Sequence, residues 1–264
     1  MTEAKQLRAP DLAAMKSRGE KISMLAVYDA TMAHLFDQAG IDVLLVGDSL
    51  GMAILGSEDT LQVTVDDMIR HTRAVRRGSK RALVLADMPF MSYQASVSDA
   101  VRNAGRLVQH GGAMALKLEG GMPILGTVER LVSIGIPVVG HLGLLPQSIH
   151  QFGGFKRQAS SPSARQKLLD EAAALESAGA CAVVLECIPS DLAQEVTARL
   201  KIPTIGIGSG PHCDGQVLVS YDLLGLTRNT PSFARRYAEL DQIVMQAAQA
   251  FIQDVKDVKD VKDV

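Results

Sequence analysis

Seven short apolar runs, separated by amphipathic stretches, constrain the fold of this chain more than any other feature of its sequence. The runs are rich in Val, Ile and Leu and lie close to Gly or Pro. Their apolar residues are continuous rather than alternating with polar ones, which is typical of strands buried on both faces of a parallel sheet. The runs cover residues 22–29, 41–48, 81–87, 113–119, 136–141, 181–186 and 202–208.

The amphipathic stretches between these runs predict helices. Ser98 and Ser190 each stand where an N-cap residue is expected. Glycines that precede three of the runs, Gly40, Gly112 and Gly179, predict helix C-caps that lead into the next strand. The helical patterns cover residues 65–77, 98–110, 124–134, 164–179 and 190–200.

This alternation predicts a parallel sheet, either closed as a (β/α)8 barrel or open and doubly wound. Dividing 264 residues by eight gives about 33 per unit, a normal length for a βα repeat. An eighth strand is less clear, and residues 215–226 are the best candidate. The open alternative usually carries G-x-G-x-x-G after its first strand, whereas this chain has YDATMAH there. We therefore expect an α/β fold, a (β/α)8 TIM barrel.

Two further helices, a long loop and a charged tail are expected besides the strand and helix repeats of the barrel. The segment up to about Gly19 predicts an N-terminal capping helix, and a further helix is predicted from Phe233 to about residue 253. Residues 142–163 predict a long loop, which in a compact domain usually acts as a lid or a binding element. The period-three repeat at 254–264 predicts a charged, solvated tail of low complexity. The expected organisation is thus one barrel domain, 1–253, followed by this tail.

Composition and charge exclude several classes of protein. A formal net charge of −2 offers no basic face for nucleic acid or an anionic membrane. The longest apolar run, around Val43 to Val46, is far too short to span a bilayer, and the N-terminus lacks the apolar core of a signal peptide. Cys181, Cys187 and Cys213 show no metal-binding spacing and suit a reducing compartment. We expect a soluble, cytoplasmic protein with no nucleic-acid or membrane partner.

Titratable side chains end six of the seven apolar runs. In a parallel barrel, functional residues lie where strands end and βα loops begin, so these side chains should meet on one rim. A single Asp in such a position is as consistent with a helix cap as with a ligand, and for Asp29 both alternatives stay open. The run-ending residues are Asp29, Asp48, Asp87, Glu119, His141 and Glu186.

Converging carboxylates predict a bound cation. Like charges in a mouth of low dielectric would repel strongly unless something neutralised them. Lys117 points to the same interior as Glu119 because it lies two residues earlier in the strand, but one lysine is not enough. The oxygen-rich donors favour Mg²⁺, with Mn²⁺ as a substitute. The cysteines are expected to be packing residues, and His141 is a candidate ligand contact because it ends a strand.

Six motifs carry a resemblance to a known family. They are VGDSLGM (46–52), DMPFMSY (87–93), KLEGG (117–121), GHLGLLPQS (140–148), LECIP (185–189) and IGIGSGPHCDGQVLV (205–219). In this order and at this spacing the chain closely resembles the ketopantoate hydroxymethyltransferases, from about residue 20 to about residue 240. The resemblance stops at the terminal repeat, and residues 227–232 (TRNTPS) differ from the family pattern.

The resemblance implies a fold, a reaction and an assembly. The family has a (β/α)8 barrel of the phosphoenolpyruvate/pyruvate superfamily and is usually a homodecamer of two pentameric rings. Its members transfer a one-carbon unit from 5,10-methylenetetrahydrofolate to 3-methyl-2-oxobutanoate, which gives 2-dehydropantoate for pantothenate biosynthesis. The implied cofactor is one Mg²⁺ per subunit, and the implied partners are the small 2-oxo acid and the folate co-substrate.

The resemblance also implies roles for individual residues. Asp48 and Asp87 match the metal ligands of the family, and Glu119 completes the Mg²⁺ site, partly through water. Ser49 and Lys117 match residues that hold the oxo acid, and Glu186 matches the general base. The full set expected to bind substrate is Asp48, Ser49, Asp87, Lys117 and His141.

The chemistry of these residue types agrees with that reaction. A 2-oxo acid can bind Mg²⁺ through its keto and carboxylate oxygens, and the metal then acts as a Lewis acid on the developing enolate. Lys117 can add electrostatic stabilisation, and Glu186, across the rim, can remove the C3 proton. The enolate then attacks the methylene carbon delivered by folate, and water completes the hydroxymethyl group.

Two other functions compete with this prediction. A C–C lyase of the same superfamily, acting on a 2-methylisocitrate-like acid, would resemble the metal rim but typically carries a cysteine in its lid, and residues 142–163 contain none. A non-catalytic, ring-forming scaffold barrel would not need a rim of mutually repelling carboxylates with a lysine.

Overall fold

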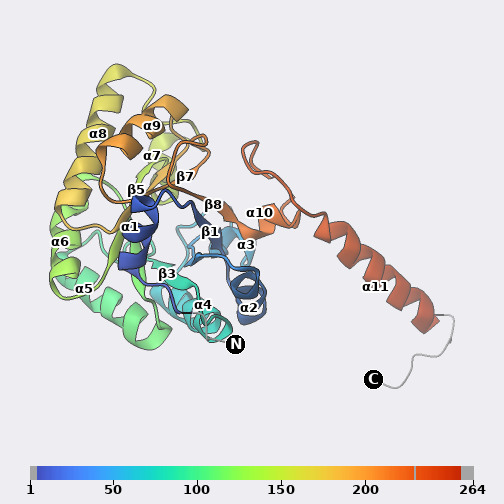
Figure 1. Cartoon of the computed structure of the whole chain (residues 1–264). Helices are drawn as coiled ribbons and strands as arrows, with labels where there is room; N and C mark the ends of the chain where they lie inside the picture. The colour runs from blue at the N-terminus through green and yellow to red at the C-terminus, as the bar shows by residue number, and fades with distance from the viewer. Residues whose placement is uncertain (1–4, 229, 257–264) are drawn as a thin grey trace. The chain divides into compact units, whose positions relative to one another are not determined.

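The computed structural model describes residues 5–228 and 230–256, and within them eight parallel strands close into a barrel in the order β1 to β8 (Figure 1). This architecture confirms the predicted (β/α)8 TIM barrel. The strands are β1 (Ile22–Ala26), β2 (Val43–Val46), β3 (Leu83–Asp87), β4 (Ala115–Glu119), β5 (Val138–Gly143), β6 (Ala182–Glu186), β7 (Thr204–Ile207) and β8 (Gly215–Val219).

The longer helices between consecutive strands cover the outside of the barrel (Figure 1). The α-helices are α1 (Ala9–Ser17), α2 (Ala30–Ala39), α3 (Leu50–Ala53), α4 (Val65–Gly78), α5 (Val97–Arg106), α6 (Leu125–Ser133), α7 (Ile149–Phe152), α8 (Pro162–Ser177), α9 (Ser190–Arg199), α10 (Ser220–Leu223) and α11 (Leu240–Lys256). A π-helical turn η1 (Leu107–Gly111) and two 3₁₀ turns, η2 (Met122–Ile124) and η3 (Pro146–Ser148), lie between them.

The barrel interior is packed with apolar side chains rather than open. Alternate residues of the strands, such as Met24 of β1 and Leu85 of β3, belong to one buried cluster. Leu12 and Met15 of α1 belong to the same cluster, together with Ile22 at the beginning of β1. The helix α1 therefore closes the end of the barrel where the strands begin, as the predicted capping helix should.

The predicted helix caps are only partly correct. Gly40 and Gly112 have the expected left-handed backbone, with φ of +93° and +78°, at the ends of α2 and η1. The prediction for Ser98 is wrong because α5 begins earlier, and the Ser96 hydroxyl accepts the bond from the backbone N–H of Asp99. The prediction for Ser190 is also wrong, since this residue is already helical and its hydroxyl makes no cap bond.

Two segments are more helical than the sequence predicts. The loop expected at 142–163 contains the end of β5, then η3, which begins at Pro146, and the single turn of α7. The eighth strand, expected over 215–226, ends at Val219, because the backbone N–H groups that follow bond locally, as Leu224 does to Ser220. Local hydrogen bonds therefore form short helical turns where the sequence predicts a loop in one segment and a strand in the other.

The chain divides into two compact units, Met1–Leu218 and Val219–Val264. In the second unit the predicted helix begins at Leu240, later than Phe233, because the N–H groups of Tyr237 and Leu240 bond to carbonyls of α10 and the residue that follows it. The helix α11 continues to Lys256, so the first residues of the predicted tail are helical, and 257–264 lie outside the described residues. The single domain of 1–253 stays a prediction. In the described part of the chain, no helix combines the length and apolar character that a membrane span requires.

Candidate active site

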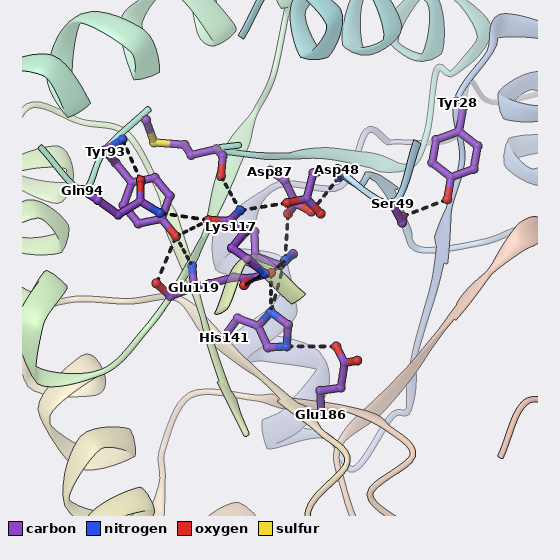
Figure 2. A network of polar contacts seen from close by, with 12 residues as sticks. Tyr28, Asp48, Ser49, Asp87, Tyr93, Gln94, Lys117, Glu119, His141 and Glu186 are labelled. Carbon is purple, nitrogen blue, oxygen red and sulfur yellow. Dashed lines mark hydrogen bonds and ion pairs between the residues drawn. The ribbon is translucent and has the colours of Figure 1, made fainter. Parts of the chain in front are cut away.

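The strand ends bring the predicted charged residues together at one rim of the barrel (Figure 2). Asp48 follows β2, Asp87 ends β3, and Lys117 and Glu119 belong to β4. In the next two strands of the ring, His141 lies in β5 and Glu186 ends β6. Five of these side chains are only 2% to 6% exposed, namely Asp48, Asp87, Lys117, Glu119 and His141. Because they are buried, their charges must be balanced by one another or by a ligand.

Strand register explains why these side chains meet. Asp87 of β3 is paired with Lys117 of β4, and Glu119 of β4 is paired with His141 of β5. Because neighbouring residues in a parallel register lie side by side on the same face, each acidic group lies beside a nitrogen-bearing one. Nζ of Lys117 accordingly lies 3.0 Å from Oδ1 of Asp87 and 3.8 Å from Oε1 of Glu119.

The imidazole of His141 connects the lysine to Glu186 (Figure 2). Its Nδ1 lies 3.2 Å from Nζ of Lys117 and 3.5 Å from Oε1 of Glu119. Its Nε2 lies 3.1 Å from Oε2 of Glu186, although the ring N–H is not aligned for a hydrogen bond to that oxygen. His141 is thus placed to hold Glu186 in position.

The GDS sequence after β2 places Ser49 next to the acidic pair. The Ser49 hydroxyl lies 2.9 Å from the hydroxyl of Tyr28. A Cβ at position 47 would lie 2.7 Å from Oγ of Ser49 and 3.6 Å from Oδ2 of Asp87. Any side chain larger than that of glycine would therefore clash with the Ser49 hydroxyl. The backbone N–H of Asp48 also donates to Oδ2 of Asp87, at 3.0 Å.

Sequence reasoning missed two residues that organise the rim. Gln147 of η3 donates from Nε2 to Oδ2 of Asp48 at 2.8 Å and from its backbone N–H to Oε2 of Glu119 at 3.0 Å. Its Oε1 accepts from the hydroxyl of Tyr93 at 2.8 Å. Both residues lie within the family motifs, but neither ends a strand, so the strand-end rule could not select them.

Asp29 makes the contact that is expected of a helix cap. Its Oδ1 accepts a hydrogen bond of 2.9 Å from the backbone N–H of Met32, and it is the N-cap of α2. This contact resolves the alternative that the sequence left open in favour of a helix cap.

The cysteines behave as packing residues. Burial raises the pKa of the Cys181 thiol to about 12, so the reactive thiolate is disfavoured. Cys187 follows Glu186 but is also kept protonated, because burial raises the pKa of its thiol to about 11.

Burial sets the protonation of the two aspartates. It raises the pKa of Asp48 well above the usual range, and repulsion from Asp87 and Glu119 adds to the effect. Burial also raises the pKa of Asp87, although the ammonium of Lys117 opposes the change. It is therefore unfavourable for Asp48 and Asp87 to be ionised at the same time, and a bound cation that neutralised their charges would be favoured.

Pairing sets the protonation of the other three groups. Burial disfavours the charged forms of Lys117, Glu119 and His141, but the opposite charges and hydrogen bonds around each group have the larger effect on its pKa. Contacts with Asp87 and Glu119 raise the pKa of Lys117, and contacts with His141 and Lys117 lower the pKa of Glu119. Contacts with Glu119 and Glu186 raise the pKa of His141, against burial and the nearby Lys117 ammonium.

The donor atoms fit an oxygen-loving cation. Two buried oxygens, Oδ1 of Asp87 and Oε1 of Glu119, accept no aligned hydrogen bond and have only the ion-pair contacts with Lys117 and His141. Among the described residues, no group of three or more His, Cys, Asp and Glu side chains could hold a metal ion. Mg²⁺ commonly takes only one or two carboxylates and completes its shell with water and substrate. The rim therefore suits Mg²⁺ held partly by a bound substrate rather than enclosed by protein.

Comparison with known proteins identifies the family. A family model described as ketopantoate hydroxymethyltransferase matches residues 6–259. This chain belongs to the ketopantoate hydroxymethyltransferase family. This match is longer than the resemblance that we predicted from the motifs, which covered about residues 20–240, and it includes residues 227–232. The predicted limits of the resemblance were therefore too narrow.

Curated relatives agree with this family. The chain is 57% identical over 242 residues to the 3-methyl-2-oxobutanoate hydroxymethyltransferase of Syntrophus aciditrophicus (strain SB), covering 91% of this chain and 89% of the relative. It is 53% identical over 256 residues to that of Moorella thermoacetica (strain ATCC 39073 / JCM 9320), covering 97% and 95%. Membership of the ketopantoate hydroxymethyltransferase family confirms the predicted transferase and supports neither the lyase nor the scaffold alternative.

Solved structures share the fold at low sequence identity. A 2,3-dimethylmalate lyase of the PEP mutase/isocitrate lyase superfamily is 18% identical, with a TM-score of 0.62, over 97% of this chain and 90% of the other. A phosphonopyruvate hydrolase, solved with oxalate and Mg²⁺, is 12% identical, with a TM-score of 0.64 and the same coverage. These likenesses show that this chain shares the fold of both proteins.

Proposed function

We propose that this protein transfers a hydroxymethyl unit from 5,10-methylenetetrahydrofolate to 3-methyl-2-oxobutanoate, giving 2-dehydropantoate for pantothenate biosynthesis, with one Mg²⁺ per subunit. Family membership supports the reaction, and one contact supports the mechanism. Glu186 reaches the barrel mouth 3.1 Å from His141, on the side of the ring opposite Asp48 and Asp87. The Glu186 carboxylate of β6 and the Lys117 ammonium of β4 are therefore linked through His141 of β5 at one rim of the barrel.

The oxo acid binds on the β2–β4 side of the rim. Asp48 and Asp87 would hold the Mg²⁺, with Glu119 as the third carboxylate of the site. The bound metal supplies Lewis-acid polarisation of the keto group. Lys117 and Ser49 hold the oxygens of the oxo acid. The Lys117 ammonium is buried and already compensated by Asp87, so it stabilises negative charge that develops on the substrate without reorganising.

Glu186 removes the C3 proton of the bound oxo acid. The carboxylate accepts the proton, and the electron pair of the C–H bond moves into the enolate, whose charge Lys117 stabilises. His141 acts through Glu186 by fixing the position of its carboxylate, at the 3.1 Å contact with Nε2. His141 is therefore a positioning residue as well as a candidate substrate contact.

Carbon–carbon bond formation follows enolisation. C3 of the enolate attacks the methylene carbon of the folate, and a C–N bond of the co-substrate breaks. Water supplies the hydroxyl group, and the second C–N bond breaks as tetrahydrofolate leaves. The proton taken from C3 and one proton of the water end on the two folate nitrogens that the methylene carbon leaves, so no oxidant or reductant is required.

Assembly and location complete the proposal. Resemblance to the family supports a homodecamer, which sedimentation analysis would test. The absence of disulfides among Cys181, Cys187 and Cys213 is consistent with work in the cytoplasm.

Turnover tests the proposed function directly. Purified protein with 3-methyl-2-oxobutanoate, methylenetetrahydrofolate and Mg²⁺ should form 2-dehydropantoate, and chelation of the metal should stop the reaction. Activity that survives complete chelation, or no product with all three present, would contradict the proposal.

A further inference from the structure

The loop between α7 and α8 carries an aromatic side chain and two adjacent cations on its surface. Phe155 is 59% exposed, and Lys156 and Arg157 are exposed beside it. Neither cation forms an ion pair with a carboxylate in the part of the chain that the structure describes, whereas exposed arginines such as Arg102 and Arg199 do. An exposed ring next to two unpaired cations is complementary to an aromatic anion.

This loop is fixed beside the proposed base. The backbone N–H of Gln158 donates to the carbonyl of Cys187 at 2.8 Å, and Cys187 directly follows Glu186. Arg157 also lies close enough to act on Cys187. Burial and the charge of Glu186 raise the pKa of the Cys187 thiol, and the positive charge of Arg157 lowers it. The backbone of this loop is therefore held next to the end of β6, the strand that carries the proposed base.

We propose that Phe155, Lys156 and Arg157 bind the p-aminobenzoylglutamate part of 5,10-methylenetetrahydrofolate. The aminobenzoyl ring packs against Phe155, and the glutamate carboxylates pair with the two cations. This inference rests on the proposed function and extends it by assigning residues to the co-substrate.

The shape of the reaction supports this placement. The methylene carbon must meet C3 of the oxo acid, whose proton Glu186 removes, so folate has to approach over the strand ends. Its carboxylates are at the far end of the molecule and must remain near the solvent, where the loop lies. The carboxylate of the oxo acid has proposed partners of its own, Ser49 and the buried Lys117, and does not need the loop.

A charge-neutral double variant, Lys156→Gln with Arg157→Gln, tests the proposal. Exposed ion pairs are each worth about 0.2–1 kcal/mol, so the KM for methylenetetrahydrofolate should rise about twofold to thirtyfold. Raising the ionic strength should raise this KM in the wild type but much less in the variant. Phe155→Leu should raise the same KM about twofold to tenfold, because it removes the ring contact.

The controls separate this site from the rest of the machinery. The matched variant Arg77→Gln with Lys80→Gln removes the same charges from exposed positions just before β3, at the other end of the barrel, and should keep the wild-type KM. Exchange of the C3 hydrogen of the oxo acid in D₂O, with Mg²⁺ and without folate, should stay at the wild-type rate in the loop variants.

Three outcomes would overturn the assignment. A folate KM equal to that of the matched control would show that the loop does not bind folate. A loss of folate-free exchange in the loop variants would show that the loop shapes the oxo-acid site instead. No folate-dependent turnover in the wild type, with exchange intact, would contradict the proposed function itself and this assignment with it.

Discussion

Nε2 of His141 lies 3.1 Å from Oε2 of Glu186, so the imidazole of β5 is in direct contact with the carboxylate at the end of β6. The other ring nitrogen of His141 faces the buried ammonium of Lys117 at 3.2 Å. Base, positioning residue and anion-stabilising cation are thus joined by two contacts across three neighbouring strands. This arrangement leads to specific expectations for each member.

Replacing the positioning residue should weaken proton removal more than substrate binding. In His141→Gln, folate-free exchange of the C3 hydrogen should fall about 10- to 100-fold, the usual effect of losing a residue that orients a ligand or base. The KM for the oxo acid should change much less. His150→Gln is the control, since this histidine of α7 is largely exposed. An unchanged exchange rate in His141→Gln would show that Glu186 needs no support from the imidazole.

Removing one proposed metal ligand should weaken Mg²⁺ binding. In Asp87→Ala, titration calorimetry should find a Kd for Mg²⁺ at least about tenfold higher, because few protein oxygens reach the metal. Asp29→Ala serves as the control because that side chain caps α2. It should lower the free energy of unfolding by about 1 kcal/mol and leave the Mg²⁺ affinity unchanged. Equal affinities in the two variants would contradict the metal assignment.

Mg²⁺ should stabilise the protein more as the pH rises. Burial raises the pKa values of Asp48 and Asp87 above the ordinary carboxyl value of 3.8. Such groups bind protons more tightly in the folded state, so their stabilisation is complete below the unfolded pKa and is lost as pH rises through the folded pKa. Mg²⁺ offsets the resulting repulsion between carboxylates.

Melting temperatures measured with and without Mg²⁺ test this expectation. The increase caused by Mg²⁺ should grow as the pH is raised from about 5 to about 8. In Asp87→Asn the growth should be smaller, because one of the two carboxyl groups is gone. A shift that is the same at every pH, or that shrinks as pH rises, would contradict the assignment of the site.

Gln147 should be important for stability although it carries no charge. Gln147→Ala would leave the buried Oδ2 of Asp48 and the carbonyl of Met88 without this amide donor. The free energy of unfolding, measured with urea, should fall by about 2–4 kcal/mol. Gln151→Ala, at an exposed position of α7, should stay within about 0.5 kcal/mol of the wild type. A similar result for both variants would show that the Gln147 network is dispensable.

Most of the fold and the charged part of the site could be predicted from the sequence. Continuous apolar runs identify buried parallel strands, and a side chain at the end of such a strand can only face the rim. Glu119 and His141 illustrate the rule, since each ends a run and the two meet in register. The same rule also selected Asp29, which caps α2, because an Asp at the end of an apolar run is expected both for a helix cap and for a ligand.

The rest could not be predicted because it depends on tertiary contacts of loops. Gln147 reaches the rim only because η3 folds back over the ends of β3 and β4. Ser96 rather than Ser98 caps α5 because both are suitable residues and the surrounding chain decides which N–H group is left free. Hydrophobic periodicity carries no information about either choice.

Hydrogen exchange at C3 of the oxo acid tests the role of Glu186, the central claim, most directly. In D₂O with Mg²⁺ and without folate, the wild-type protein should exchange the C3 hydrogen of 3-methyl-2-oxobutanoate. Glu186→Gln keeps the size of the side chain but removes the proton acceptor, so exchange should fall about 10²–10⁴-fold. Binding of the oxo acid should change little. Exchange at the wild-type rate in Glu186→Gln would contradict the mechanism, because another group would then have to remove the proton.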